Sequence, residues 1–529
     1  MRTVTERTSL SNPLEICEVA CGGGVLGLTL CPGKVASSYA GAPWRRDLAL
    51  DLDRVATWGA KVVVTLMGDP ELRGLNVPDL GAKVRDRGMD WIQLPIVDGA
   101  APDGAFERRW AVFGHLIRSR LAAGERVLIH CRGGLGRAGT VAARLLIEGG
   151  MTPVAAVAAV RAARPGAVET RAQETYLADL APPPRQSQNA DRLIGCLLGG
   201  AVGDAFGYGV EFTKLPEILR TYGPDGLTEP ELQNGKLVVS DDTQMTLFTA
   251  EALTHTQNPG HECDIEAAAE GIRRGYLKWY ETQVERWHGP GSRPGRMGSF
   301  PELWACRAPG DTCLSALAAG GRGTIERPIN NSKGCGGVMR VAPIGLYLQL
   351  TPVAAFDLAA RAAAFTHGHP LGYLSAGALA HLIRQLVAGV DLLVAVEATV
   401  AHTAEWANSE DLVSILRRAV ELAGDTSISP RNAIARLGEG WVGEEALAIA
   451  IFAAMRGGSF REALALGANH NGDSDSTASI AGQIWGAVHG VSCIPTAWIA
   501  ALDVLDPMSE VVGRMVRLNV SFERERDVQ

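Results

Sequence analysis

The stretch His130-Cys-Arg-Gly-Gly-Leu-Gly-Arg137 follows a short apolar run, Val127-Leu-Ile129, and precedes a run with helical spacing, Thr140 to Leu146. This order predicts a strand, a tight glycine-rich loop and the start of a helix around one cysteine. The side chains of Cys131 and Arg137 can meet only if the loop between them curls. Its backbone N–H groups then converge beside a helix N-terminus, which makes a cradle for an anion.

The chemistry of this loop points to phosphoryl groups. A helix dipole and the charge of Arg137 both favour the thiolate of Cys131, and a thiolate aimed at a bound phosphate is a nucleophile. An arginine fork suits two equatorial phosphate oxygens. The alternative is a buried structural cysteine before a glycine-rich turn. That alternative leaves the arginine, the hydroxyl of Thr140 and an upstream aspartate unexplained.

Three segments together resemble the dual-specificity phosphatases, and within them the cyclin-dependent-kinase-associated phosphatases. The resemblance covers residues 12–180 and rests on Pro95 to Asp103, on His130 to Arg137 and on Ala167 to Leu177. It implies a nucleophile at Cys131, a phosphate clamp at Arg137, a general acid at Asp98, a hydroxyl at Thr140 that assists departure of the thiolate, a water-orienting amide at Gln173, and a phosphate-binding loop of Arg132, Gly133, Gly134, Leu135 and Gly136. Asp103 is the alternative acid, although motif position favours Asp98.

Composition limits what the whole chain can be. Its 529 residues suggest two to four domains, and 47% hydrophobic with 20% charged residues is globular composition. Aromatic residues make up only 6%, while glycine is abundant, as in tightly crossed helices. The formal net charge of -8 disfavours nucleic acid as the main partner.

Cysteine usage and hydropathy indicate the compartment. The ten cysteines form no Cys-x-x-Cys pair, which favours free thiols over a disulfide framework. The segment Val19 to Leu30 is interrupted by glycines and a cysteine, unlike a signal peptide. The longest apolar run, Ala446 to Met455, is too short for a bilayer. We therefore expect a soluble cytoplasmic protein with no membrane partner and leave its oligomeric state open.

A proline-rich linker, residues 181–189, divides the chain into two expected domains, 12–180 and 190–520. The first alternates short β-branched runs with helical patterns, which predicts an α/β domain with a mainly parallel sheet. Its expected strands are Lys61 to Leu66 and Val127 to Ile129, and its expected helices are Asp51 to Gly59, Phe106 to Ala122 and Thr152 to Ala163.

The second domain has few strand signals, and its alanine-rich helical spacing predicts an all-α fold. The stretch Gly289 to Gly298 is expected to be a long loop. No tandem repeat is present. The expected helices are Asp191 to Phe206, Gln244 to His255, Asp264 to Thr282, Pro352 to Thr366, Leu371 to Gly389, Val394 to Ala407, Ser409 to Ala423, Gly443 to Met455 and Ser476 to His489.

Two acidic clusters stand far apart in the second domain, Ser240-Asp-Asp-Thr243 and Gly472-Asp-Ser-Asp-Ser476. Both begin predicted helices, so helix capping explains part of each cluster. Each cluster contains more acids than a cap requires. Carboxylates gathered in one site repel each other unless cations neutralise them, and oxygen ligands suit hard ions such as Mg²⁺ or Mn²⁺.

A second resemblance, over residues 190–520, is to the ADP-ribosylglycohydrolase family, which includes the dinitrogenase-reductase-activating glycohydrolases. It rests on an ordered series of segments: Asp191 to Gly207, Ser240 to Thr243, Asn331 to Gly345, Thr366 to His369 and Gly472 to Ser476. The resemblance implies two divalent cations, Mg²⁺ or Mn²⁺, held by Ser240, Asp241, Asp242, Asp473, Asp475 and Ser476. It also implies an ADP-ribose ligand at Glu211, Asn331, Ser332, Gly334 and His367, with Glu211 as a catalytic carboxylate. The implied reaction is hydrolysis at C1″ of the ribose.

Several positions keep simpler explanations. Asn331 and Ser332 also fit a turn between helices, and His367 and His369 also fit a helical core. The family more often has threonine at positions 240, 474 and 476, and small residues at the positions of Lys333 and Cys335. These departures affect specificity rather than reaction class.

The resemblances imply a bifunctional hydrolase that removes ADP-ribose from proteins or small compounds and phosphate from a phosphoprotein or phosphorylated small molecule. One alternative is a single hydrolase whose first domain only binds phosphate. Another is an ADP-ribose reader that serves the phosphatase.

Overall fold

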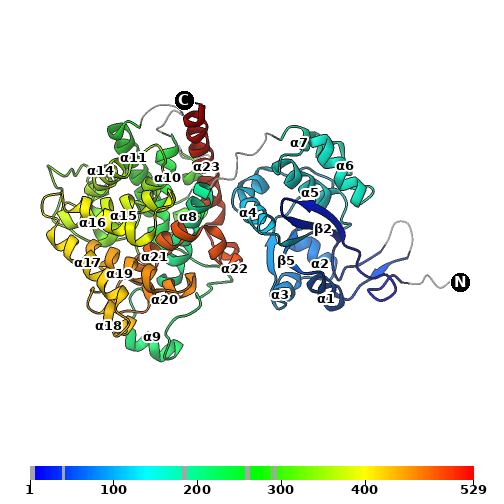
Figure 1. Cartoon of the computed structure of the whole chain (residues 1–529), viewed down its shortest axis with the longest axis horizontal. Coiled ribbons are helices and arrows are strands. Elements are labelled where there is room, and N and C mark those ends of the chain that lie inside the picture. Colours follow the sequence, from blue (N-terminus) through cyan, green and yellow to red (C-terminus); the bar gives the residue numbers. More distant parts are fainter. Residues whose placement is uncertain are drawn as a thin grey trace. The chain divides into compact units, whose positions relative to one another are not determined.

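The computed structural model describes residues 6–37, 42–180, 188–255, 263–287, 289 and 295–528. The chain divides into two compact units, Met1–Pro184 and Arg185–Gln529 (Figure 1). Residues 181–187 of the expected linker lie outside the described residues, whereas residues 188 and 189 begin helix α8. No helix in the described part of the chain is long and apolar enough to cross a membrane.

The first unit is built on a five-stranded sheet with the order β1 (Cys17–Cys21), β2 (Gly24–Leu30), β7 (Arg126–Cys131), β5 (Ala60–Thr65) and β6 (Asp90–Gln93). β1 is antiparallel to β2, and the other neighbours are parallel, so the predicted mainly parallel sheet is confirmed. The register places Leu30 opposite Cys131 and Thr65 opposite His130. The segments that follow β2, β5, β6 and β7 therefore meet at one edge of the sheet.

Seven helices and a short ribbon complete the described first unit. They are α1 (Leu48–Trp58), α2 (Asp69–Gly74), α3 (Leu80–Arg85), α4 (Gly104–Ala122), α5 (Gly136–Glu148), α6 (Pro153–Ala163) and α7 (Arg171–Ala178), with the ribbon β3 (Val35–Ala36) and β4 (Trp44–Arg45). Helices α4 and α5 both pack against β2 and β7. Helix α5 begins four residues before the predicted start at Thr140, because the loop after β7 leads directly into its first turn.

The described second unit is helical apart from isolated β-bridges, which confirms the all-α prediction. Its α-helices are α8 (Gln188–Tyr208), α9 (Leu215–Tyr222), α10 (Asp241–His255), α11 (Ile265–Val284), α12 (Asp311–Ala318), α13 (Ala342–Gly345), α14 (Pro352–Ala364), α15 (Pro370–Val387), α16 (Leu392–Thr403), α17 (Glu410–Gly424), α18 (Pro430–Ile434), α19 (Gly443–Arg456), α20 (Phe460–Ala468), α21 (Ser474–His489), α22 (Thr496–Ala501) and α23 (Leu505–Val528). Short 3-10 turns are η1 (Met297–Ser299), η2 (Pro301–Trp304), η3 (Cys335–Gly337) and η4 (Val491–Cys493). Much of the expected loop Gly289 to Gly298 lies outside the described residues, and its last two residues belong to η1.

Helices α8 and α21 cross closely along a stripe of small residues. A Cβ added to Gly199 would lie 2.2 Å from the carbonyl oxygen of Gly482, and one added to Gly203 would lie 2.2 Å from that of Ala478. Such contacts are too short for any side chain, so the backbones themselves touch. This packing sets the first turn of α21, which carries Asp475, beside the last turns of α8.

Replacing Gly199 by valine is expected to destabilise the second unit by about 3 kcal/mol or more, the upper end for overpacked cores, because a backbone oxygen cannot move aside. The measurement is the urea midpoint for loss of helix by circular dichroism. Gly424→Ala is the matched control, since no atom lies within 4 Å of its added Cβ. Equal midpoints for the two variants would contradict the close backbone contact.

Candidate active sites

The loop after β7 has the curled form that the sequence predicts. Gly134 has a positive φ of 72°, and a Cβ there would lie 2.3 Å from the carbonyl oxygen of Thr29, so only glycine fits. The N–H of Gly134 donates to the sulfur of Cys131 at 3.2 Å. On the other side, Arg164 donates to the carbonyl oxygens of Gly134 at 2.6 Å and Gly133 at 3.1 Å. With these carbonyls held by Arg164, the loop is fixed as a cradle around the sulfur.

Arg137 is buried at the edge of the cradle and is held by two carboxylates. Its Nη1 and Nη2 donate to both oxygens of Glu71, at 2.7 and 2.9 Å, and Nη2 also lies 2.9 Å from Asp98 Oδ1. The Nε atom is buried without a hydrogen-bond partner, which leaves one guanidinium donor for a phosphate oxygen. No sequence pattern predicted that Glu71 would pair with Arg137. The one available indication was that Glu71 follows β5, whose carboxyl end lies at the same edge of the sheet.

The two candidate acids occupy different positions. Asp98 extends from the segment after β6, contacts Arg137 and keeps 67% of its side chain exposed. Asp103 instead caps α4, because its carboxylate accepts the N–H of Phe106 at 2.8 Å. A cleft of about 640 Å³ beside the cradle is lined by Glu71, Asp98, Asp103, Phe106, Arg109, Arg132 and neighbouring residues.

Thr140 and Gln173 are not bonded to the cysteine. The hydroxyl of Thr140 donates to the carbonyl oxygen of Gly136 at 2.8 Å, inside α5. The amide of Gln173 caps α7 and donates to the carbonyl oxygen of Ala100 at 3.2 Å, which ties α7 to the segment that carries Asp98. Glu169, which the sequence reasoning missed, accepts the N–H of Gly136 at 2.8 Å.

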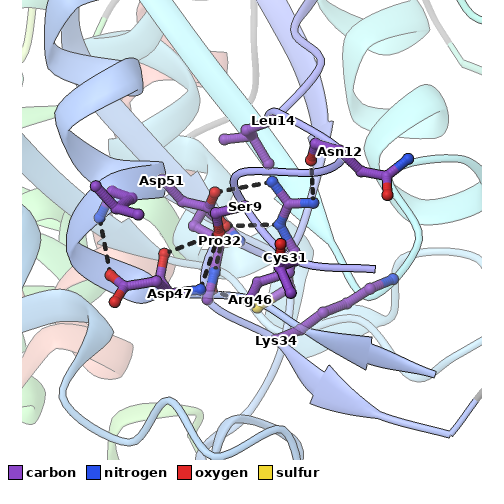
Figure 2. A network of polar contacts seen from close by, with 12 residues as sticks. Ser9, Asn12, Leu14, Cys31, Pro32, Lys34, Arg46, Asp47 and Asp51 are labelled. Carbon is purple, nitrogen blue, oxygen red and sulfur yellow. Dashed lines mark hydrogen bonds and ion pairs between the residues drawn. The ribbon is translucent and has the colours of Figure 1, made fainter. Parts of the chain in front are cut away.

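Lys34 is a further cation at the cradle that no pattern marked. Its ammonium donates to the carbonyl oxygen of Arg132 at 3.2 Å. Figure 2 shows the buried ion pair that fixes its segment, in which Asp51 accepts from Arg46 at 2.7 and 2.8 Å and from the N–H of Gly33 at 2.8 Å. Burial lowers the pKa of Lys34 to about 8, against the opposing influence of nearby thiols, including Cys131.

Replacing Lys34 by methionine is expected to lower kcat/KM for aryl phosphate hydrolysis, the activity that the resemblance implies, roughly fivefold at pH values well below 8. This is equivalent to about 1 kcal/mol of lost attraction between the ammonium and an anion bound in the cradle. The ammonium is charged below its pKa of about 8 and neutral above it. The difference between variant and native chain should therefore narrow as the pH rises through 8. A pH–rate profile measures this, with the exposed Lys83→Met as control; a pH-independent difference would contradict it.

In the second unit the two acidic clusters meet in one cleft. Asp241 and Asp242 from the start of α10, and Asp473, Asp475 and Ser476 from the start of α21, line a cleft of about 390 Å³ together with Glu211. The four aspartates are at most 5% exposed. Ser240 is fully buried behind them, and its hydroxyl accepts the N–H of Asp242 at 3.2 Å. Residues more than 230 positions apart are thus combined into one site.

Capping explains only part of these clusters. Asp473 caps α21, with its Oδ1 accepting the N–H of Ser476 at 3.2 Å. The start of α10 is fixed by Asp204 of α8, whose carboxylate accepts the N–H groups of Ser240 at 2.8 Å and Thr243 at 3.0 Å. Asp204 belongs to the segment Asp191 to Gly207 that resembles the family, but the sequence did not predict that it fixes the start of α10. The carboxylates of Asp241, Asp242 and Asp475 exceed what capping requires.

The cleft concentrates negative charge that the protein does not neutralise. Burial, followed by repulsion from Asp473 and Asp241, raises the pKa of Glu211 to about 9. Burial likewise raises the pKa of Asp204 to about 6, and burial with neighbouring carboxylates raises those of Asp241, Asp242 and Asp475 well above the usual range.

Two oxygens in the cleft, Asp242 Oδ2 and Glu211 Oε2, are buried without a partner. Among the described residues no three His, Cys, Asp or Glu side chains already surround one point as metal ligands. Where no cation is bound, burial therefore favours the protonated forms of Glu211, Asp241, Asp242 and Asp475. An all-oxygen donor set with orphaned oxygens fits hard divalent cations that would displace those protons.

Only some of the residues that the resemblance assigns to ADP-ribose binding lie in the cleft. Gly334 and His367 line it, whereas Asn331 is exposed elsewhere and Ser332 bonds the N–H of Gly334 at 3.3 Å. Burial lowers the pKa of His367 to about 3, so the ring is neutral. His369 caps α15 by accepting the N–H of Leu371 at 3.1 Å.

The sequence did not predict two features of the cleft, an aromatic pair at its mouth and the contact of Cys335, which it marked only as a departure from the family. At its mouth the exposed ring of Phe212 stacks on Trp441, with centroids 5.9 Å apart and planes inclined by 22°. Inside it, the thiol of Cys335 donates to Asp473 Oδ2 at 2.7 Å. An aromatic pair and a lone cysteine give no spacing signal in one sequence.

An anion cradle at the carboxyl edge of a parallel sheet, and a buried carboxylate cleft in a helical unit, define a chain with two hydrolase-type domains. Residues 185–524 match the family model described as ADP-ribosylglycohydrolase, and residues 45–177 match the model of the Swiss Army Knife protein, DSP-PTPase phosphatase domain. The chain belongs to the ADP-ribosylglycohydrolase family and carries an N-terminal domain of the dual-specificity phosphatase type. Both predicted resemblances are confirmed.

Relatives of each domain are distant. ADP-ribosylhydrolase ARH3 of Danio rerio is 27% identical, over 62% of this chain and 89% of its own length. ADP-ribosyl-[dinitrogen reductase] glycohydrolase of Rhodospirillum rubrum is 25% identical, over 59% of this chain and 91% of its own. A solved structure of kinase associated phosphatase is 28% identical, covering 31% of this chain and 93% of its own, with a TM-score of 0.28.

Proposed function

We propose that the protein is a bifunctional hydrolase. The second unit removes ADP-ribose from modified proteins or ADP-ribosyl compounds, and the first removes phosphate from a phosphoprotein or a phosphorylated small molecule. The observation that carries the ADP-ribosyl hydrolase function is the cleft in which Glu211 meets both acidic clusters. The phosphatase function is supported by the cradle around Cys131, with Arg137 and Asp98 in contact beside it.

In the proposed phosphatase step the sulfur of Cys131 attacks phosphorus while Asp98 protonates the departing oxygen. The loop N–H groups and the free Nε of Arg137 hold the equatorial oxygens. The phosphocysteine then formed is hydrolysed by water. Arg137 positions Asp98, and Asp103 remains a helix cap, so we assign the acid to Asp98 rather than Asp103.

In the proposed hydrolase step the substrate ribose lies in the carboxylate cleft. Two Mg²⁺ or Mn²⁺ ions, held by Ser240, Asp241, Asp242, Asp473, Asp475 and Ser476, would bind ribose hydroxyls and stabilise the leaving group. Glu211, with its unpartnered oxygen at the same cleft, accepts the proton of the attacking water. Gly334 and His367 contact the ligand from the cleft wall, and Phe212 with Trp441 offers it a flat apolar surface at the mouth.

The setting we propose is cytoplasmic. All ten cysteines lie among the described residues and none forms a disulfide, which fits a reducing compartment. A reducing compartment also keeps the sulfur of Cys131 from being oxidised.

The test of the hydrolase is release of free ADP-ribose from a mixed pool of arginine-linked and serine-linked ADP-ribosylated proteins, with Mg²⁺, with Mn²⁺ and with chelator. Release that requires a metal supports the proposal and identifies the linkage. Tight ADP-ribose binding with no release from any linkage would replace it by the reader function. Phosphate release from an aryl phosphate, measured beside it, separates a phosphatase from a phosphate-binding module.

A further inference from the structure

Cys335 lies among the side chains proposed to hold the cations. It opens the turn η3 in the wall of the carboxylate cleft, where its N–H donates to the carbonyl oxygen of Trp441 at 3.1 Å. Its thiol donates to Asp473 Oδ2 at 2.7 Å, also contacts the side chain of Ser476, and lies within electrostatic reach of Asp242. The sulfur therefore contacts two of the proposed ligands at the start of α21, and Asp242 of α10 lines the same cleft.

A second observation points to a ligand at the same place. Asp242 is 2% exposed and lines the cleft, yet its Oδ2 has no hydrogen-bond partner. Lys333, which precedes this turn, is paired with Glu444 and so does not serve as that partner. A buried carboxylate oxygen usually has a hydrogen-bond partner. Here it has none and faces a cleft that also holds a thiol, so the two groups are ligand atoms that could bind a cation.

We propose that Cys335 gives this cleft a second metal-binding mode, in which a thiophilic divalent cation of the Zn²⁺ or Cd²⁺ class draws the sulfur and the carboxylates of Asp473 and Asp242 together as its ligands. Among the described residues no three such side chains surround one point before the cation binds. Thiolate is a soft ligand that selects such ions, whereas Mg²⁺ leaves the thiol protonated. On binding, the S–H bond breaks, its proton leaves to solvent and a sulfur–metal bond forms, with no change of oxidation state.

This binding mode has a consequence for the proposed hydrolase. The carboxylates of Asp473 and Asp242 belong to both donor sets, so the thiophilic ion and the hard ion compete for them. A site that takes Zn²⁺ through sulfur prefers tetrahedral geometry, which differs from the octahedral oxygen geometry of Mg²⁺. Thiophilic cations should therefore exclude the hard ions from this cleft.

The experiment is a titration of the full metal-free chain with Cd²⁺, followed by the ultraviolet thiolate-to-cadmium charge-transfer band. The comparison is between Cys335→Ser and the exposed Cys306→Ser as matched control. We expect Cys335→Ser to lose one cadmium–thiolate site and to bind Cd²⁺ at least about tenfold more weakly, the smallest cost of a damaged metal shell. Cys306→Ser should keep that site.

Two further readouts keep the test decisive. Excess Mn²⁺ added to the native chain should suppress the Cys335-dependent band, because Asp473 and Asp242 are shared; this arm needs no variant. Thermal unfolding of Cys335→Ser checks that it is folded. A band of equal size in both variants, or one that Mn²⁺ does not affect, would overturn the proposal. Since the readout is binding, failure of the hydrolase assay would not by itself affect it.

Discussion

Replacing Cys131 by serine is expected to lower phosphate release by about a thousandfold or more, because removal of a nucleophile removes the covalent step altogether. The cradle should survive the change. Gly134 keeps its N–H aimed at the side-chain atom, and Arg164 still holds the loop carbonyls. The variant should therefore bind a phosphorylated ligand without turning it over. Phosphate release and retention of the ligand on immobilised protein measure the two effects.

The control for this change is Cys21→Ser, which alters a buried thiol at the end of the sheet away from the cradle and should leave phosphate release near the native rate. Release by Cys131→Ser at the native rate would exclude a cysteine nucleophile. A native chain that retains phosphorylated ligand but releases no phosphate would instead favour the phosphate-binding module. The exposed Asp98, in contact with Arg137, is the feature that argues against that outcome.

The sequence was sufficient for the framework of the cradle but not for its charge balance. A strand, a glycine-rich loop and a helix start are local features, so the spacing of Cys131 and Arg137 predicts the curl. Glu71 and Lys34 come from positions 60 and 97 residues before Cys131, and only the parallel sheet brings them to the same edge. Ordinary charged residues at such distances carry no pattern that one sequence reveals.

The carboxylate cleft illustrates the same limit. The ordered segments predicted that the clusters at Asp241 and Asp475 would meet, and they do, because α8 and α21 touch along their small residues. The sequence assigned no role to Asp204. A carboxylate that holds a helix start and one that binds a ligand differ only in the groups they contact, and the sequence does not show those groups. Asn331 was expected at the ligand and is exposed outside the cleft. A motif fixes the neighbourhood of a residue but not the direction of its side chain.

Metal removal is expected to make the stability of the second unit depend on pH. Burial raises the folded-state pKa of Asp204 to about 6 and that of Glu211 to about 9, both above their unfolded values. The protonated, folded form is therefore favoured at low pH, and this stability is lost as the pH rises through those values. With chelator the unfolding temperature should fall as the pH rises from about 4, where both groups ionise in the unfolded chain, to about 9, where Glu211 ionises in the folded chain. Saturating Mn²⁺ should restore it, because a cation that binds only the folded state stabilises it.

Asp475→Asn separates the metal site from the fold in this experiment. Asp475 is buried among Asp242, Asp473 and Glu211, so the nearly isosteric change removes one repulsive charge and one proposed ligand. Without metal the variant should be at least as stable as the native chain at high pH. With Mn²⁺ it should gain less stability and release ADP-ribose at least about a hundredfold more slowly. The control is Asp425→Asn, which changes a partly exposed carboxylate outside the cleft. If Asp475→Asn lost stability without metal and kept its response to Mn²⁺, the cluster would serve folding rather than cation binding.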